Sequence, residues 1–274
     1  MSKFKVGLIQ IKVEDKKEDN LHKAARLIDN ICKEDVDMVI LPEMFSCPYN
    51  TKNFPIYAEE EGDYSYKFLS EISKRNNIYL IAGSIPEKEG SNIYNTSYVF
   101  NRQGEKIAKH RKIHLFDIDI KNKQRFRESD TLSAGDKVTV FDSEFGKIGL
   151  CICYDFRFPE LARLMVDKGA KAIIVPASFN MTTGPAHWDI MFRSRAIDNQ
   201  VYTIGCSPAR DYDYSYISYG HSLIVSPYGD ILCELDEKEN FITYDIDLDY
   251  VDEIREQLPL LKHRRSDLYE LLEK

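Results

Sequence analysis

The stretch GLCICYDFRFPELARL, Gly149–Leu164, decides the fold that we expect for this chain. It has the pattern of a buried strand that ends at Cys153, a tight connection, and a helix that begins near Pro159. A nucleophile must be exposed and held in one direction, and a sharp turn from strand to helix provides both. The adjacent helix N-terminus also favours negative charge, which promotes the thiolate form of a cysteine. The stretch therefore predicts an α/β fold with Cys153 as a candidate nucleophile.

Position alone does not separate a nucleophile from a buried structural thiol, the role we expect for Cys151 inside the strand. A free thiol titrates near pH 8.5, so a nucleophilic cysteine needs a neighbouring base or cation. Two other predicted strands end in such groups, because Glu43 follows DMVILP and Lys112 follows EKIAKHR. The carboxyl ends of strands in α/β sheets meet at a common edge. We therefore expect Glu43, Lys112 and Cys153 to lie close together.

Strands and helices alternate along both halves of the chain. We expect strands over residues 4–11, 37–43, 78–85, 93–101, 105–112, 138–142, 147–153, 172–178, 201–207, 221–227, 231–236 and 241–247. Residues 113–137 have no clear period and predict a long loop, which is uncommon unless it is functional. About a dozen strands exceed what one open sheet normally holds, so we expect two packed sheets with helices outside. No linker divides the chain, and a single domain over 1–274 is the simplest interpretation.

Composition and charge exclude several classes of protein. The chain has 37 Lys and Arg against 45 Asp and Glu, a net charge of -8 with the two signs interspersed. A nucleic-acid partner needs a clustered basic face, so we expect none. No apolar stretch approaches membrane-spanning length and the N-terminus lacks a signal-peptide pattern, which favours a cytoplasmic protein without a membrane partner. The six cysteines are scattered, and we expect most of them to be reduced.

Other chemistries have weaker support. Histidine is the commoner cysteine activator, and His114 and His187 lie where they could line a pocket, so a Cys–His hydrolase stays open on pattern alone. There is no CxxC or HExxH, which argues against a metal site. There is no GxGxxG or Walker sequence either, and we expect no cofactor. Outside the enzymes, a binding protein remains the alternative.

The contexts LPEMF, HRKIHLFD and GLCICYDFRFPE, in that order, resemble the nitrilase superfamily of carbon–nitrogen hydrolases over almost the full length. Within it the chain looks like the omega-amidases, through FSCPYNTKNFPIYAE, SFNMTTGPAHW, RSRAIDNQVY and GHSLIVSPYGD. The resemblance implies a four-layer α-β-β-α sandwich. It also implies a homodimer or larger homo-oligomer, with contacts made by a helical tail from about residue 249.

The resemblance further implies a catalytic triad at Glu43, Lys112 and Cys153, with a second active-site glutamate at Glu128 in RFRESD. The implied substrates are small dicarboxylate monoamides such as 2-oxoglutaramate and 2-oxosuccinamate. Their hydrolysis gives the 2-oxo acid and ammonia through a thioester on Cys153. An amidase for another small substrate, such as deaminated glutathione or an N-carbamoyl compound, is the alternative within the superfamily.

We expect four further positions to bind the substrate. The backbone N–H of Tyr154 would face the oxyanion, and Arg157 would hold the substrate's anionic end, because a buried unpaired carboxylate is costly. Phe179 and Thr183, in SFNMTTG, match pocket positions that flank the substrate. The chain departs from its relatives in the tyrosine-rich stretch DYDYSYISY, 211–219, which we expect to alter the mouth of the pocket, and in Ala134, where relatives commonly have proline.

Overall fold

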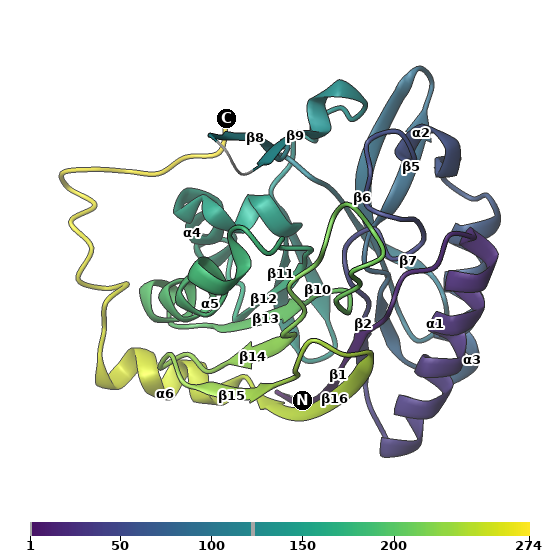
Figure 1. The fold of residues 1–274 in the computed structure, drawn as a ribbon. Coiled ribbons are helices and arrows are strands. Elements are labelled where there is room, and N and C mark those ends of the chain that lie inside the picture. Colours follow the sequence, from purple (N-terminus) through teal and green to yellow (C-terminus); the bar gives the residue numbers. More distant parts are fainter. Residues whose placement is uncertain (1, 122–123) are drawn as a thin grey trace.

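The computed structural model describes residues 2–121 and 124–274, and its strands form two large sheets and one hairpin (Figure 1). The strands are β1 Lys3–Gln10, β2 Met38–Ile40, β3 Glu59–Glu60, β4 Tyr79–Ile81, β5 Ile85–Glu89, β6 Asn92–Phe100, β7 Lys106–Arg111, β8 Asp117–Ile120, β9 Gln124–Arg127, β10 Thr139–Ser143, β11 Gly146–Leu150, β12 Ala172–Pro176, β13 Tyr202–Cys206, β14 Leu223–Val225, β15 Ile231–Glu234 and β16 Asn240–Asp247. The α-helices are α1 Lys17–Ile31, α2 Phe54–Tyr57, α3 Tyr64–Asn76, α4 Pro159–Asp167, α5 Gly184–Asn199 and α6 Asp249–Gln257.

Each of the two large sheets contains three adjacent parallel strands. The first has the order β16-β1-β2-β4-β6-β5-β3, with β7 also paired to β6, and the second has the order β10-β11-β12-β13-β14-β15. In the first sheet β1, β2 and β4 are parallel, and in the second β11, β12 and β13 are parallel. Because β6 is antiparallel to both β4 and β7, the carboxyl ends of β2, β4 and β7 lie at one edge.

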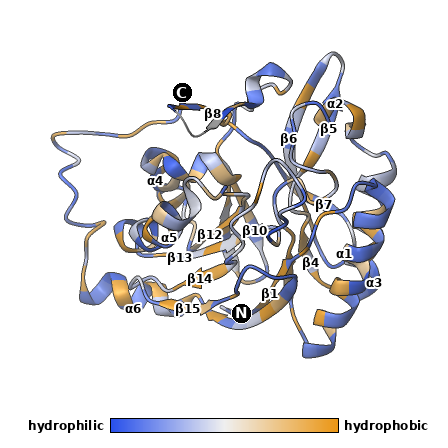
Figure 2. Cartoon of the chain, in the orientation of Figure 1, coloured by the Kyte–Doolittle hydropathy of each residue, from blue (hydrophilic) through white to orange (hydrophobic). Residues whose placement is uncertain are grey.

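Three hydrophobic clusters lie between the layers, and the burial of their side chains holds the layers together. Along β1 the side chains of Val6 and Leu8 enter the cluster between the two sheets, whereas Ile9 and Ile11 enter the cluster beneath α1 and α3. A third cluster lies between the second sheet and the pair α4 and α5. Figure 2 shows hydrophobic strands inside and hydrophilic helix faces outside. The predicted four-layer α-β-β-α sandwich is thereby confirmed.

Local predictions differ from the structure at three places. Residues 113–137 are not all loop, because β8 and β9 form a short antiparallel hairpin there and a 3₁₀ turn covers Glu128–Asp130. The strand predicted over 78–85 is split into β4 and the start of β5, since Gly83 has a left-handed φ of 49° and turns the chain. Strand β11 ends at Leu150, so Cys153 begins a 3₁₀ turn, Cys153–Arg157, instead of ending a strand.

The C-terminal segment leaves the sandwich after α6 and runs along its surface towards α4 (Figure 1). Arg264 pairs with Asp167 at 2.6 Å and Glu273 pairs with Lys168 at 2.6 Å, which fastens the segment beside α4. Within residues 2–121 and 124–274, the structure contains no helix with the length and apolarity needed to cross a membrane.

Candidate active site

The predicted triad residues all lie just beyond strand ends. Glu43 follows β2 and Lys112 follows β7, both in the first sheet, whereas Cys153 follows β11 in the second sheet. The structure brings the three side chains together, as expected for groups at the carboxyl edge of packed α/β sheets. The site therefore spans the junction between the two sheets.

Lys112 is the centre of a buried charge cluster. Its Nζ lies 2.9 Å from Oε1 of Glu43 and 2.9 Å from each carboxylate oxygen of Glu128, and all three side chains have 0% exposure. Burial would lower the pKa of Lys112, but the charges of Glu128 and Glu43 outweigh it and raise that pKa above its usual range. The two carboxylates therefore favour the charged ammonium and fix its direction.

The two oxygens of Glu43 have different surroundings. Oε1 accepts hydrogen bonds from Lys112, from Nδ2 of Asn95 at 2.8 Å and from the hydroxyl of Tyr49 at 3.1 Å. Oε2 is buried and accepts no such bond from the described part of the chain. Burial raises the pKa of Glu43, and the Lys112 charge opposes that rise. The carboxylate is thus ready to accept a proton on the oxygen that is not already engaged.

Cys153 is 4% exposed and has a left-handed φ of 47°. Burial raises the pKa of its thiol, the Glu43 carboxylate raises it further, and Lys112 and the backbone N–H of Ser178 oppose the rise. The resting thiol is therefore neutral, so it must lose its proton as it attacks. The adjacent Glu43 is the group that can take that proton.

Asp155 ties the Cys153 turn to the segment around Lys112. Its buried carboxylate lies 2.9 Å from Nε2 of His110 and 2.8 Å from the backbone nitrogen of His114, and it accepts the N–H of Ile152 at 3.1 Å. Burial alone would raise the pKa of Asp155, but hydrogen bonds from both histidines hold it below its usual range. The carboxylate stays ionised and sets the spacing between the two sheets at the site.

Close packing fixes the backbone of Lys112 as well. Its N–H donates to the carbonyl of Asn95 at 2.9 Å, and its carbonyl accepts the N–H of Gly135 at 2.8 Å. A Cβ on Gly135 would lie 2.2 Å from the carbonyl oxygen of Arg111, so only glycine fits there. Ala134 lies directly before this contact.

The Arg157 guanidinium lies over the rings of two other predicted substrate-binding residues, Tyr154 and Phe179. Tyr154 is in the first turn of the 3₁₀ segment, where N–H groups have no intrahelical acceptor. The Arg157 guanidinium lies 4.5 Å from the ring centre of Phe179 and 3.0 Å from Nδ1 of His187. Thr183 precedes α5, and its hydroxyl donates to Asn180 at 3.1 Å. In residues 2–121 and 124–274 the Arg157 guanidinium contacts His187 and Met191 and forms no ion pair with a carboxylate, so its charge is available to a ligand.

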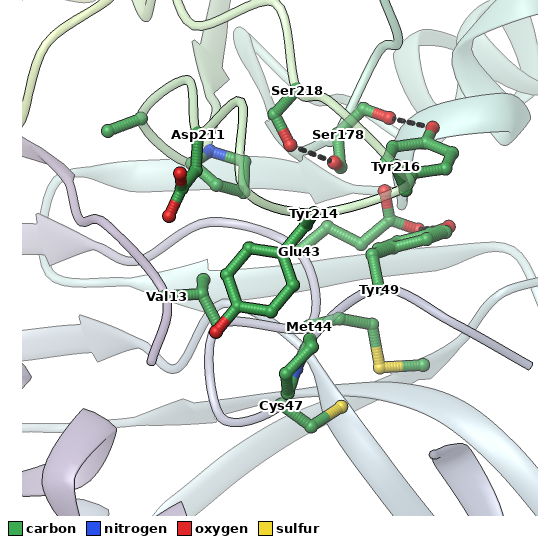
Figure 3. A pocket seen from close by; sticks show the side chains of 13 residues that line it. Val13, Glu43, Met44, Cys47, Tyr49, Ser178, Asp211, Tyr214, Tyr216 and Ser218 are labelled. Carbon is green, nitrogen blue, oxygen red and sulfur yellow. Dashed lines mark hydrogen bonds between the residues drawn. The ribbon is translucent and has the colours of Figure 1, made fainter. Parts of the chain in front are cut away.

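A small cavity of about 30 Å³ adjoins Glu43 (Figure 3). The tyrosine-rich stretch covers one side of it with Tyr214 and Tyr216, and the hydroxyl of Tyr216 donates to the carbonyl of Ser178 at 2.5 Å. A volume of this size accommodates one or two water molecules. The stretch 211–219 therefore lines this cavity and limits the space beside Glu43.

The histidines have other partners. His114 binds Asp155 and stacks on Phe158 with ring centres 3.7 Å apart, and His187 contacts Arg157. Among the described residues no histidine ring forms a hydrogen bond with Cys153, so the geometry favours a carboxylate base over the Cys–His alternative. No group of three His, Cys, Asp or Glu in the described ranges could hold a metal ion.

Sequence reasoning missed the polar residues that hold the cluster: Tyr49, Asn95, Asp155 and Ser178. Asp155 follows Cys153 by two positions, and a charged residue in such a place is a usable signal. Asn95 gives a weaker signal, because Thr96 and Ser97 beside it in β6 are polar as well. Tyr49 and Ser178 carry no such signal, because neither residue type is unusual in a loop.

Comparisons with known proteins agree with the fold and the site. A profile of the carbon–nitrogen hydrolase family matches residues 5–256, and the chain belongs to that family. The chain is 50% identical to omega-amidase NIT2-B of Xenopus laevis over 100% of this chain and 99% of that protein. It is 46% identical to omega-amidase NIT2 of Homo sapiens over 98% of both chains.

Among solved structures, Nit3 of Saccharomyces cerevisiae, a member of branch 10 of the nitrilase superfamily, is similar with a TM-score of 0.89. The identity is 44%, and the match covers 96% of this chain and 97% of the yeast chain. The predicted membership of the nitrilase superfamily is therefore confirmed.

Proposed function

We propose that the protein is an omega-amidase that hydrolyses the terminal amide of a small dicarboxylate monoamide, such as 2-oxoglutaramate or 2-oxosuccinamate. The observation that carries the proposal is the buried Glu43–Lys112–Glu128 cluster beside Cys153, together with an Arg157 guanidinium that has no carboxylate partner among the described residues. The first feature supports amide hydrolysis by a cysteine. The second supports a substrate with an anionic end.

In the first half of the reaction Cys153 forms a thioester. Glu43 takes the thiol proton on Oε2 while sulfur attacks the amide carbon, and the developing oxyanion is stabilised by the Lys112 ammonium and the N–H of Tyr154. Glu43 then gives the proton to the amide nitrogen. The carbon–nitrogen bond breaks and ammonia leaves.

In the second half Glu43, again ionised, accepts a proton from water as the water oxygen attacks the thioester carbon. The same donors stabilise the second oxyanion. Collapse of this second tetrahedral intermediate breaks the bond to sulfur and releases the carboxylic acid. The Cys153 sulfur then recovers its proton from Glu43. Glu128 keeps Lys112 in place throughout, through its two contacts of 2.9 Å.

Specificity rests on the residues beyond the nucleophile. The Arg157 guanidinium can hold a carboxylate bidentately, and Phe179 stacks beneath it at 4.5 Å and limits its movement. Thr183 narrows the same side of the site, and its hydroxyl, already donating to Asn180, presents lone pairs to a ligand donor.

Ammonia release from a panel of amides tests the proposal. We expect turnover of 2-oxoglutaramate and 2-oxosuccinamate to exceed that of glutamine, deaminated glutathione and N-carbamoyl amino acids, with Cys153→Ala inactive. A preference for deaminated glutathione or an N-carbamoyl compound would replace the proposed substrate. Absence of turnover for the whole panel would favour a binding protein, and turnover that survives in Cys153→Ala would contradict the mechanism.

We also propose that the chain works in the cytoplasm as a homodimer or larger homo-oligomer. Free thiols at all six cysteines support a reducing compartment. Leu268 and Leu272 in the C-terminal segment are 69% and 67% exposed, which supports burial of this segment against a second copy. Light scattering of the full chain and of Leu268→Asp tests the second point, because an unchanged oligomer in the variant would contradict it.

A further inference from the structure

The hydroxyl of Tyr49 lies between the two glutamates of the site. It is 3.1 Å from Oε1 of Glu43, 2.5 Å from Oε1 of Glu128 and 3.5 Å from Nζ of Lys112. Figure 3 shows Tyr49 and Glu43 at the same end of the cavity, beneath Tyr216. One phenol thus bridges the base and the carboxylate that holds Lys112.

The ring of Tyr49 is held firmly enough to aim this hydroxyl. It stacks on Tyr216 with ring centres 4.4 Å apart and an angle of 28°, and it meets Phe54 edge-on at 5.5 Å. Phe126 contacts it from β9 at 5.7 Å. Because aromatic rings hold it from α2, β9 and the loop 211–219, the phenol oxygen has little freedom to leave the carboxylates.

The two carboxylates beside Tyr49 need a hydrogen-bond donor in addition to Lys112. The titratable groups that face it are Glu43, Glu128, Lys112, Cys153 and Tyr216. While Cys153 is a neutral thiol, two carboxylates share a single ammonium, and buried carboxylates need hydrogen-bond donors to stay ionised. Burial and the two carboxylates raise the pKa of Tyr49 well above its usual value, so the phenol keeps its proton and acts as a donor.

We propose that Tyr49 is a positioning residue for the catalytic base: its hydroxyl, shared by Glu43 and Glu128, keeps Glu43 ionised and turns its free oxygen towards Cys153. Lys112 and Asn95 already donate to Oε1 of Glu43, so neither can replace the Tyr49 hydroxyl, whose single proton is shared between Glu43 at 3.1 Å and Glu128 at 2.5 Å. Oε2 is then the oxygen that receives the thiol proton. This inference rests on the proposed amidase mechanism, in which Glu43 is the base.

Tyr49→Phe removes the hydroxyl and keeps the ring packing, so it tests the proposal directly. A hydrogen bond to a charged group contributes enough that we expect kcat to fall roughly 10 to 100-fold, with KM little changed. Without this donor the pKa of Glu43 rises further, so the acid limb of the kcat/KM profile moves to higher pH. Tyr202→Phe, a buried tyrosine of β13 outside the site, is the matched control and should leave both unchanged.

A second variant keeps the test decisive if Tyr49→Phe does not fold. Incorporation of 3-fluorotyrosine at position 49 makes the phenol a stronger donor, and the acid limb should then move to lower pH. The rate at which iodoacetamide alkylates Cys153, followed by mass spectrometry across pH, reports the pKa of Glu43 without turnover of a substrate.

If the proposed substrate is wrong, turnover is absent but the pH dependence of alkylation can still be measured. Failure of the proposed function and failure of this inference therefore give different results.

A purely structural role for Tyr49 predicts another result. Tyr49→Phe would then lower Tm, but the pH of its acid limb, in turnover and in alkylation, would equal that of the wild type and of Tyr202→Phe. That result would overturn the proposal. So would an acid limb at the same pH in the phenylalanine and fluorotyrosine variants.

Discussion

Asp155 and His114 are joined by two hydrogen bonds, because the Asp155 carboxylate accepts both the backbone N–H and the ring Nδ1–H of His114 at 2.8 Å. Asp155 follows Cys153, the proposed nucleophile, by two residues, and His114 follows Lys112 by two residues. The pair therefore joins the turn that begins at Cys153 to the end of β7, where Lys112 lies. An ionised carboxylate can make this connection because it accepts several donors at once.

Replacement of Asp155 by asparagine should destabilise the protein by about 2–3 kcal/mol at pH 7, since hydrogen bonds to a charged group are lost. The pKa of Asp155 is lowered in the folded state, so its stabilisation is complete above the unfolded pKa of about 3.9. It is lost as pH falls through the lower folded value. Urea unfolding of both proteins at pH 7 and in acid checks this, because the difference in unfolding free energy must shrink only in acid.

Lys112→Met should lower kcat roughly 100 to 1000-fold, because it removes a donor to the oxyanion. Lys109→Ala is the matched control, since Lys109 lies on β7, the strand that Lys112 follows, but binds Glu61 and Glu87. Circular dichroism establishes that both variants fold. Near-normal turnover of Lys112→Met would assign the oxyanion to other donors.

Arg157→Lys should raise KM for 2-oxoglutaramate about tenfold, and Arg157→Ala should raise it further, because lysine keeps the charge but loses the bidentate fork. An uncharged amide of the same length should show little change. Parallel kinetics with both substrates provide the measurement. An equal loss for the two amides would mean that Arg157 does not recognise the anionic end.

The pH dependence of kcat/KM should show an acid limb above the ordinary glutamate pKa of about 4.3, because burial raises the pKa of Glu43. Activity needs the ionised carboxylate, so it falls as pH drops through that raised value. Glu43→Gln should be inactive, whereas His187→Ala should remain active. The reverse pattern would support a histidine base, and stopped assays at constant ionic strength between pH 4 and 9 decide between them.

Cys153→Gly should be more stable than Cys153→Ala by about 1 kcal/mol, the opposite of the usual order. Both variants lose the sulfur, but alanine keeps a Cβ at a φ of 47°, a conformation that costs non-glycine residues about that much. Thermal unfolding of the two inactive proteins compares them without interference from turnover. Equal stabilities would show that the turn relaxes when the thiol is absent.

Some of the site could be predicted from the sequence because its residues follow predicted strands. Glu43 comes after the apolar run DMVILP and Lys112 after the strand-like run EKIAKHR, and the family resemblance identified their partners. The hairpin β8–β9 was missed because both strands are four residues long and bury little, so periodicity gives a weak signal. Tyr49 was missed for another reason, since its importance depends on two carboxylates that are distant in sequence.

Because the site is divided between two sheets, activity requires that the two sheets have docked. The proposed base and cation, Glu43 and Lys112, follow strands of the first sheet, and the proposed nucleophile, Cys153, follows a strand of the second, so neither sheet alone would be active. During refolding, backbone structure can form within each sheet before the sheets dock. Recovery of turnover should then lag behind recovery of the circular dichroism signal. Product formation would therefore mark the moment when the two sheets dock.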